Sequence, residues 1–198
     1  MRTLSERTAD QAAIVEAGMN AMAKEIRVAI PGIVEAWDKD TQTVSVRCAI
    51  RERIRNDENI SEMEIPMLVD VPVVFPSAGG YSFLACPAKG DECLVIFADM
   101  CIDAWWQNGS VQSQMEYRRH DLSDGFAIMG CWSQPNLRKK FPTEGCVMQN
   151  ASGTAGISIR GGTVNLFGTV QINGQTYDGH KHTGVTAGNS KTGGVDVG

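Results

Sequence analysis

Residues 27–54, with the sequence RVAIPGIVEAWDKDTQTVSVRCAIRERI, contain the pattern that decides the fold. In the second half of this stretch, apolar side chains occupy every second position, at Val44, Val46, Cys48 and Ile50. A period of two is typical of a β-strand with one buried face, because successive side chains point to opposite faces. The polar run 38–41 separates this segment from an earlier apolar one, so we predict a β-hairpin between 27–37 and 43–54.

Further strand-like segments follow along the chain, after a charged stretch at 55–62 that we expect to be mobile. The segments predicted as strands are 66–74, 81–86, 92–97, 102–106 and 125–132. Turns rich in glycine and proline, at 77–80 and 87–91, lie between them. Short strands at regular spacing favour a small closed antiparallel barrel, and we predict an OB-fold over residues 27–140.

An amphipathic helix is expected before the barrel, within residues 1–26. Apolar residues recur there at spacings of three and four, at Ile14, Ala17, Ala21, Met22 and Ile26. The sequence leaves open whether this helix packs on its own barrel or on a neighbouring copy. Apart from this helix, the chain is predicted to be all-β.

The composition changes sharply near residue 145, which indicates a domain boundary. The four Trp and seven Pro all precede this point, whereas residues 145–198 hold 13 of the 21 Gly. Three alternating apolar pairs follow, with glycine turns between them: Ile157 and Ile159, Val164 and Leu166, and Val170 and Ile172. Each piece offers only two inward side chains, and we expect it to lack strand neighbours within its own chain, so that it cannot bury an apolar face alone.

Three copies wound around one axis would solve this problem, because the apolar side chains would meet on the axis and the sheet edges would close. We therefore predict a trimeric intertwined β-helix, or β-prism, that forms a stiff spike over residues 145–178. The alternative is a flexible glycine-rich tail, and the strict alternation counts against it.

Two histidines near the C-terminus, His180 and His182, form the strongest candidate site. In an extended chain, residues two apart point the same way, so one copy supplies two imidazoles and three copies supply six. Six nitrogen ligands suit an octahedral ion such as iron(II), with nickel or cobalt as alternatives, and fit tetrahedral zinc poorly. We expect one iron ion per trimer to cap the apex at 179–198 and to stabilise the assembled chains.

Charge and motif content disfavour several other functions. The net charge is −5 and the longest basic run is Arg138-Lys139-Lys140, so a nucleic-acid partner is not expected. The sequence contains no secretion signal and no membrane-spanning apolar run, and we expect the chain to be made in a cytoplasm.

No residue is assigned an enzymatic role. The third histidine, His120, lies in a segment that we interpret as a charged loop before a strand. The six cysteines form no CxxC pair, and we expect Cys86, Cys93 and Cys101 to be buried as small apolar groups. The aromatic residues that a nucleic-acid-binding barrel would use for stacking are interpreted as core or interface residues, namely Trp105, Trp106 and Trp132.

Several motifs resemble the baseplate central spike proteins of contractile-tailed bacteriophages. The motifs are Pro72–Pro76 with Gly79-Gly80, Pro87–Asp91, Ile102–Trp105 and Arg119–Gly125, and together they cover about residues 27–135. The segment His180–Gly184 resembles the apex of these proteins, where two histidines of each chain bind an iron ion.

This resemblance implies a homotrimer in the virion, attached by its OB end to a baseplate hub protein at the tip of the tail. Sheath contraction would drive the spike through the bacterial outer membrane without an enzymatic step. The sequence leaves two other readings open: an OB-fold nucleic-acid-binding protein with a metal-binding tail, and a metallohydrolase that uses His120, His180 and His182. A spike of a bacteriocin-like or secretion-type injection device fits the same residues.

Overall fold

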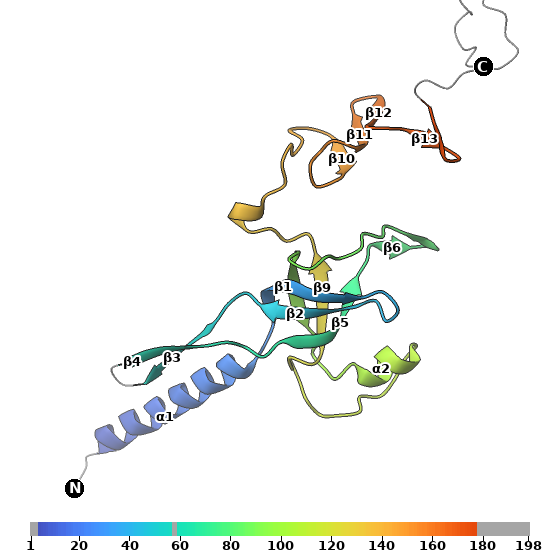
Figure 1. Cartoon of the computed structure of the whole chain (residues 1–198). Coiled ribbons are helices and arrows are strands. Elements are labelled where there is room, and N and C mark those ends of the chain that lie inside the picture. Colours follow the sequence, from blue (N-terminus) through green and yellow to red (C-terminus); the bar gives the residue numbers. More distant parts are fainter. Residues whose placement is uncertain (1–3, 57–58, 178–198) are drawn as a thin grey trace, which may run out of the picture. The chain divides into compact units, whose positions relative to one another are not determined.

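The computed structural model describes residues 4–56 and 59–177, and the chain divides into two units, Met1–Asn136 and Leu137–Gly198 (Figure 1). The first unit contains α1 (Leu4–Glu25), β1 (Ala29–Asp38), β2 (Thr43–Cys48), β3 (Glu52–Asn56), β4 (Asn59–Met63), β5 (Leu68–Val74), β6 (Ser77–Ala78), β7 (Tyr81–Ser82), β8 (Glu92–Phe97), α2 (Asp103–Asn108), β9 (Gly125–Met129) and a short 3₁₀ helix (Gln134–Asn136). The second unit contains β10 (Cys146–Gln149), β11 (Gly156–Arg160), β12 (Thr163–Phe167), β13 (Gln171–Ile172) and β14 (Gln175–Thr176).

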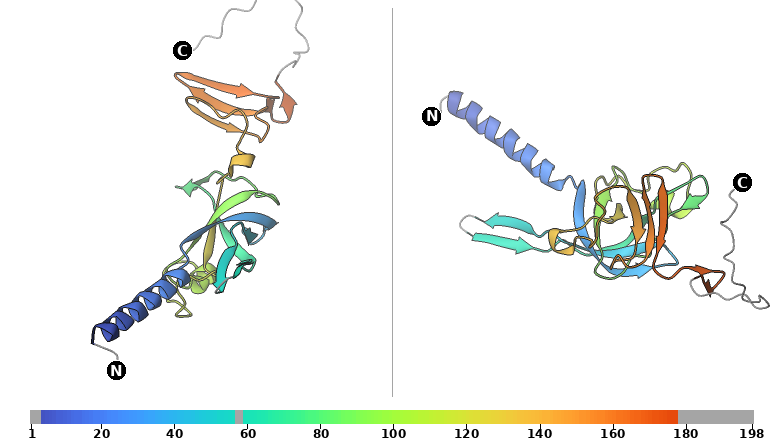
Figure 2. Two further views of the ribbon diagram at one scale, coloured as in Figure 1. Left: turned by 90° about the vertical axis from the view of Figure 1, so that its left-hand side faces the viewer. Right: turned by 90° about the horizontal axis from the view of Figure 1, so that it is seen from above.

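Five strands of the first unit close into a barrel in the order β1-β2-β5-β9-β8, which confirms the predicted OB-like barrel (Figure 2). The pair β5–β9 is parallel and the other pairs are antiparallel, so the prediction of an antiparallel barrel holds for every pair but one. The reason is geometric. Directions cannot alternate around a closed ring with an odd number of strands, so at least one pair must be parallel.

The core of the barrel comes from the alternation noted in the sequence. Many of the inward side chains are small, and several are fully buried: Val34, Val44, Val46, Val95 and Ala127. Gly32 on β1 faces Cys48 of β2 and Cys93 of β8 in the strand register. The absence of a side chain at Gly32 leaves the room that Val46 occupies.

Three predicted strands of the first unit differ from the structure. The strand predicted over 43–54 ends as β2 at Cys48, and Ile50, expected on its buried face, is 54% exposed. Residues 102–106 lie largely in the helix α2, because the N–H of Trp106 donates to the carbonyl of Ile102 at 2.8 Å and Asp103 in the first turn suits the helix dipole. Gly109, with φ +65°, ends this helix. Of the predicted strand at 81–86, only Tyr81–Ser82 pairs, as β7 with β6.

The charged stretch at 55–62 is also different from its prediction. Instead of a mobile loop, the segments β3 and β4 pair as an antiparallel hairpin. Arginines on β3 and its flank face acidic residues across this hairpin, with Arg51 at 2.9 Å from Glu64 and Arg53 at 3.7 Å from Glu62. Charge pairing of this kind gives no apolar alternation, so the usual strand signal is missing from the sequence.

The second unit forms short strands that pair within one chain. The strands β10, β11 and β12 form an antiparallel sheet in sequence order, and β13 pairs with β14. The expectation that these pieces lack neighbours in their own chain was therefore wrong, since turns at Asn150–Ala155 and at Gly161-Gly162 bring them together. The winding of three chains into a β-helix stays a prediction.

The helix α1 carries exposed apolar side chains, including Ile14, Val15 and Met19. Its amphipathic character is expected from the sequence, and the side chains described between residues 11 and 20 are all exposed. Among the described residues, no helix combines the length and the apolar content that crossing a membrane requires.

A side chain at Gly32 should disrupt the barrel core. In the Gly32→Ala variant, the added Cβ would overlap Cγ1 of Val46 and lie 3.4 Å from Sγ of Cys93. We expect the free energy of unfolding to fall by about 2 kcal/mol, as is typical of overpacking, in urea unfolding followed by far-ultraviolet circular dichroism, which reports on the strands of both units. The matched control is Gly162→Ala, whose added Cβ meets no atom within 4 Å. Equal losses in the two variants would contradict this account of the core.

Candidate functional site

The predicted metal ligands His180 and His182 lie outside the described residues, so their arrangement stays a prediction. The other histidine, His120, lies in the first unit, where its Nε2 atom is 3.3 Å from a carboxylate oxygen of Asp99. His120 has a positive φ of 47°, which fits the loop that the sequence indicates.

The sheet β10–β11–β12 of the second unit has two chemically different faces. The register places Cys146, Ile159 and Val164 in one cross-strand row, and Met148, Ile157 and Leu166 in the row beside it. Directly opposed residues share a face, and residues two apart on a strand share it too, so these six side chains lie on one face. The strands are drawn side by side in both figures that show the ribbon (Figures 1 and 2).

This face, which we call the apolar sheet face, is exposed throughout. The exposed fractions reach 61% at Met148, 64% at Val164 and 59% at Leu166, and Cys146, Ile157 and Ile159 are exposed as well. The opposite face contains polar residues such as Ser158 and Asn165 in the central row. A sheet normally covers its apolar face with another layer, and none of the described side chains covers this one well. The arrangement is typical of a surface that packs against another molecule.

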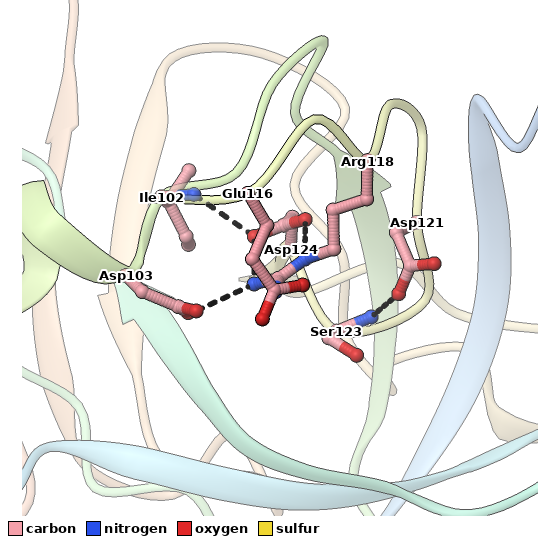
Figure 3. Close-up of polar contacts among 7 residues, drawn as sticks. All are labelled: Ile102, Asp103, Glu116, Arg118, Asp121, Ser123 and Asp124. Carbon is pink, nitrogen blue, oxygen red and sulfur yellow. Dashed lines mark hydrogen bonds and ion pairs between the residues drawn. The ribbon is translucent and has the colours of Figure 1, made fainter. Parts of the chain in front are cut away.

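A buried ion pair organises the loop before β9 in the first unit (Figure 3). Asp124 is fully buried, and its two carboxylate oxygens accept hydrogen bonds from Nε and Nη2 of Arg118 at 2.7 and 2.9 Å. The N–H of Ile102 donates to the same carboxylate at 2.9 Å, and Nη2 of Arg118 also reaches Asp103 at 2.8 Å. These contacts join the start of α2 to the start of β9.

The same cluster brings together three groups that a metal ion could use. Ligand atoms of Cys101, Asp103 and Asp124 lie within 4.8 Å of one another. The guanidinium of Arg118 already bonds both carboxylates, and these bonds raise the pKa of Arg118 above its usual value. The cluster therefore carries its own cation, and we interpret it as a structural ion pair.

The nearby residues His120, Asp121 and Ser123 lie in a turn. The carboxylate of Asp121 accepts a hydrogen bond from the backbone N–H of Ser123 at 2.9 Å, which holds the pKa of Asp121 below its usual value. An aspartate that bonds the backbone two residues on is typical of an Asx turn. The loop interpretation from the sequence agrees with these contacts.

The cysteines agree only in part with the expectation from the sequence. Cys93 and Cys101 are buried as predicted, but Cys86 is exposed, because β7 ends at Ser82 and the chain does not continue as a barrel strand. Burial raises the pKa of the Cys93 thiol to about 11, so this thiol stays protonated at neutral pH.

The fold defines a mostly β protein, with an OB-like barrel domain and a separate glycine-rich unit. Residues 30–130, which span β1 to β9, match the family model described as phage protein Gp138 N-terminal domain. Because this match covers half of the chain, the protein belongs to that family. The family resemblance noted in the sequence is thus confirmed, and the chain is a phage structural protein and a component of the virion. No curated protein matches the chain.

Removing the buried charge of Asp124 should destabilise the first unit. In Asp124→Asn, the guanidinium of Arg118 loses the partner that it contacts with two nitrogens, at a site with no exposed surface on the aspartate. We expect the free energy of unfolding to fall by about 3 kcal/mol in urea titrations.

The matched control is Glu116→Gln, which also removes a carboxylate from Arg118. The side chain of Glu116 is 64% exposed, and we expect a loss of less than about 1 kcal/mol. If the two variants were equally stable, the ion pair would not organise this loop.

Proposed function

We propose that three copies of this chain form the central spike at the tip of a contractile phage tail. The observation that carries the proposal is the apolar sheet face of the second unit, which stays exposed in one chain. The barrel domain belongs to a phage protein family, which supports a place in the virion. The face supports a particular kind of assembly, in which copies of the glycine-rich unit cover one another.

Burial of the apolar sheet face would contribute favourably to association. Its six side chains are each about half exposed, so burying them contributes about 1 kcal/mol per side chain in each copy. Three copies are proposed because a closed arrangement lets every copy cover its neighbours, and because the two histidines of one chain are too few for a closed metal site.

We further propose that His180 and His182 of three copies bind one iron ion at the apex. Six imidazole nitrogens would satisfy an octahedral ion, and the ion would hold three chain ends that otherwise separate. The bound ion would then oppose fraying at the narrow end of the spike.

The proposed role is mechanical and involves no enzymatic step. The barrel domain would attach to a baseplate hub protein, and sheath contraction would push the spike through the bacterial outer membrane. A spike of a bacteriocin-like or secretion-type device would use the same features. Membership of a phage protein family favours a phage tail over such a device.

The arginines of the first unit argue against the alternative of a nucleic-acid-binding barrel. A phosphate-binding surface needs positive charges that are free to replace counterions. Most arginines described here are paired with carboxylates, including Arg27 with Glu52, Arg47 with Glu35, Arg51 with Glu64, Arg118 with Asp124 and Arg119 with Asp99.

A charge on the apolar sheet face should separate the copies. We expect the full chain to have three times the mass of one chain in sedimentation equilibrium, whereas Leu166→Glu should be largely monomeric, because it buries an unpaired charge in the contact. The control is Asn165→Glu, which adds the same charge on the opposite face of β12 and should stay trimeric. A monomeric wild-type chain would refute the proposed assembly.

Metal content tests the apex. We expect elemental analysis of the purified trimer to find one iron per three chains, and the double variant His180→Ala with His182→Ala to lose this iron and to melt at a lower temperature. His120→Ala is the control, because His120 pairs with Asp99 in the first unit and should not alter the iron content. Iron that persists in the double variant would place the metal elsewhere.

A further inference from the structure

The outer surface of the barrel is apolar on one side. Cross-strand pairing places Val74, Ile128, Leu94 and Pro31 in one row, and Phe126, Ile96 and Ala29 in the next. These side chains point outward, because their neighbours along the strands, such as Val95 and Ala127, are fully buried in the core. Exposure is 43% at Val74, 38% at Ile128 and 37% at Ile96.

Two tryptophans of α2 extend this surface. The ring of Trp105 lies 5.8 Å from the ring of Phe126, and Trp106 lies 6.3 Å from Trp105. Trp105 and Trp106 are 45% and 42% exposed. We call the two rows and these tryptophans the barrel apolar face. By contrast, Glu35, further along β1, forms ion pairs with Arg47 of β2 and with Lys89.

The tryptophans are held in place by the buried ion pair. Asp103, the first residue of α2, bonds Arg118, and the preceding Ile102 donates its N–H to Asp124. A rigid surface loses little side-chain and loop entropy when it binds. Exposed tryptophans on a rigid support are typical of residues that dominate the energy of a protein interface.

The same unit carries a second, protruding apolar feature. The hairpin β6–β7 turns at Gly79-Gly80, which have positive φ of 60° and 83°, and the N–H of Phe83 donates to the carbonyl of Pro76 at 2.9 Å. Tyr81, Phe83 and Leu84 are 82%, 72% and 73% exposed. We call residues 77–84 the apolar arm. The arm leaves its own barrel face uncovered, because both surfaces are exposed in the same chain.

We infer that the apolar arm of one copy packs on the barrel apolar face of the next copy, so that the barrel domains of the trimer contact one another. The inference rests on the proposed trimer. One chain carries two different apolar surfaces, a projecting arm and a broad face, as a head-to-tail contact in a closed ring requires. The exposed apolar side chains of the two surfaces amount to on the order of 1,000 Å², which is about the minimum for a specific interface.

Site-specific photocrosslinking of the full chain tests this contact. A benzoylphenylalanine placed at Phe83 should, after irradiation, give a band of two-chain mass whose crosslinked peptide contains Trp105, Phe126 or Ile128. The control carries the same group at Tyr117, which is 94% exposed and outside both surfaces, and should give no such peptide. A Phe83 crosslink that stays within one chain, or that maps to other peptides of the second chain, would overturn the inference.

A second variant separates this contact from the trimer itself. Ile128→Glu places a charge on the barrel apolar face and should lower the two-chain crosslink from Phe83 by about tenfold or more, while the mass stays that of three chains. Val69→Glu, at another exposed position of the barrel, should leave the yield unchanged. If the wild-type chain were monomeric, the proposed trimer would fail; a trimer without the crosslink would refute only the arm contact.

Discussion

A ring of five strands cannot alternate in direction all the way round, and this chain meets the constraint by pairing β5 with β9 in parallel. A parallel pair needs a long crossing between its strands. Residues 75–124 make that crossing, and they contain the apolar arm, β8 and α2. The ion pair of Asp124 and Arg118 lies where the crossing ends, so it fixes a segment that strand pairing alone would leave loose.

Both units of the chain keep apolar side chains that one copy does not bury. In the first unit they lie on the outer wall of a closed barrel, whereas in the second they cover one face of an open three-stranded sheet. An exposed apolar residue alone is ordinary, but whole rows that share a face are not. Each surface, through its own strand register, supports the proposed association with further copies of the chain.

The sequence predicts the barrel well because its core strands alternate strictly, as at Val44 and Val46. Prediction from the sequence fails where one residue pattern is compatible with two structures. The aromatic residues at 102–106 favour a strand by propensity, yet a local helix places them. In β3 and β4, cross-strand charge pairs replace the apolar alternation that would have indicated strands. The barrel apolar face could not be predicted, because it depends on which strands are neighbours in the barrel. The need for one parallel pair follows from the odd number of barrel strands, and no single residue indicates it. The predicted metal ligands His180 and His182 lie outside the described residues.

The open sheet of the second unit has a further consequence for how the protein must be produced. Its outer strands β10 and β12 each have a side without a strand partner among the described elements, next to a wholly apolar face. Unpaired strand edges can form hydrogen bonds with strands of other chains, so that the sheet extends into an aggregate. Association with the proposed partner copies would therefore compete with aggregation. Synthesis of several chains close together on one messenger RNA would favour association.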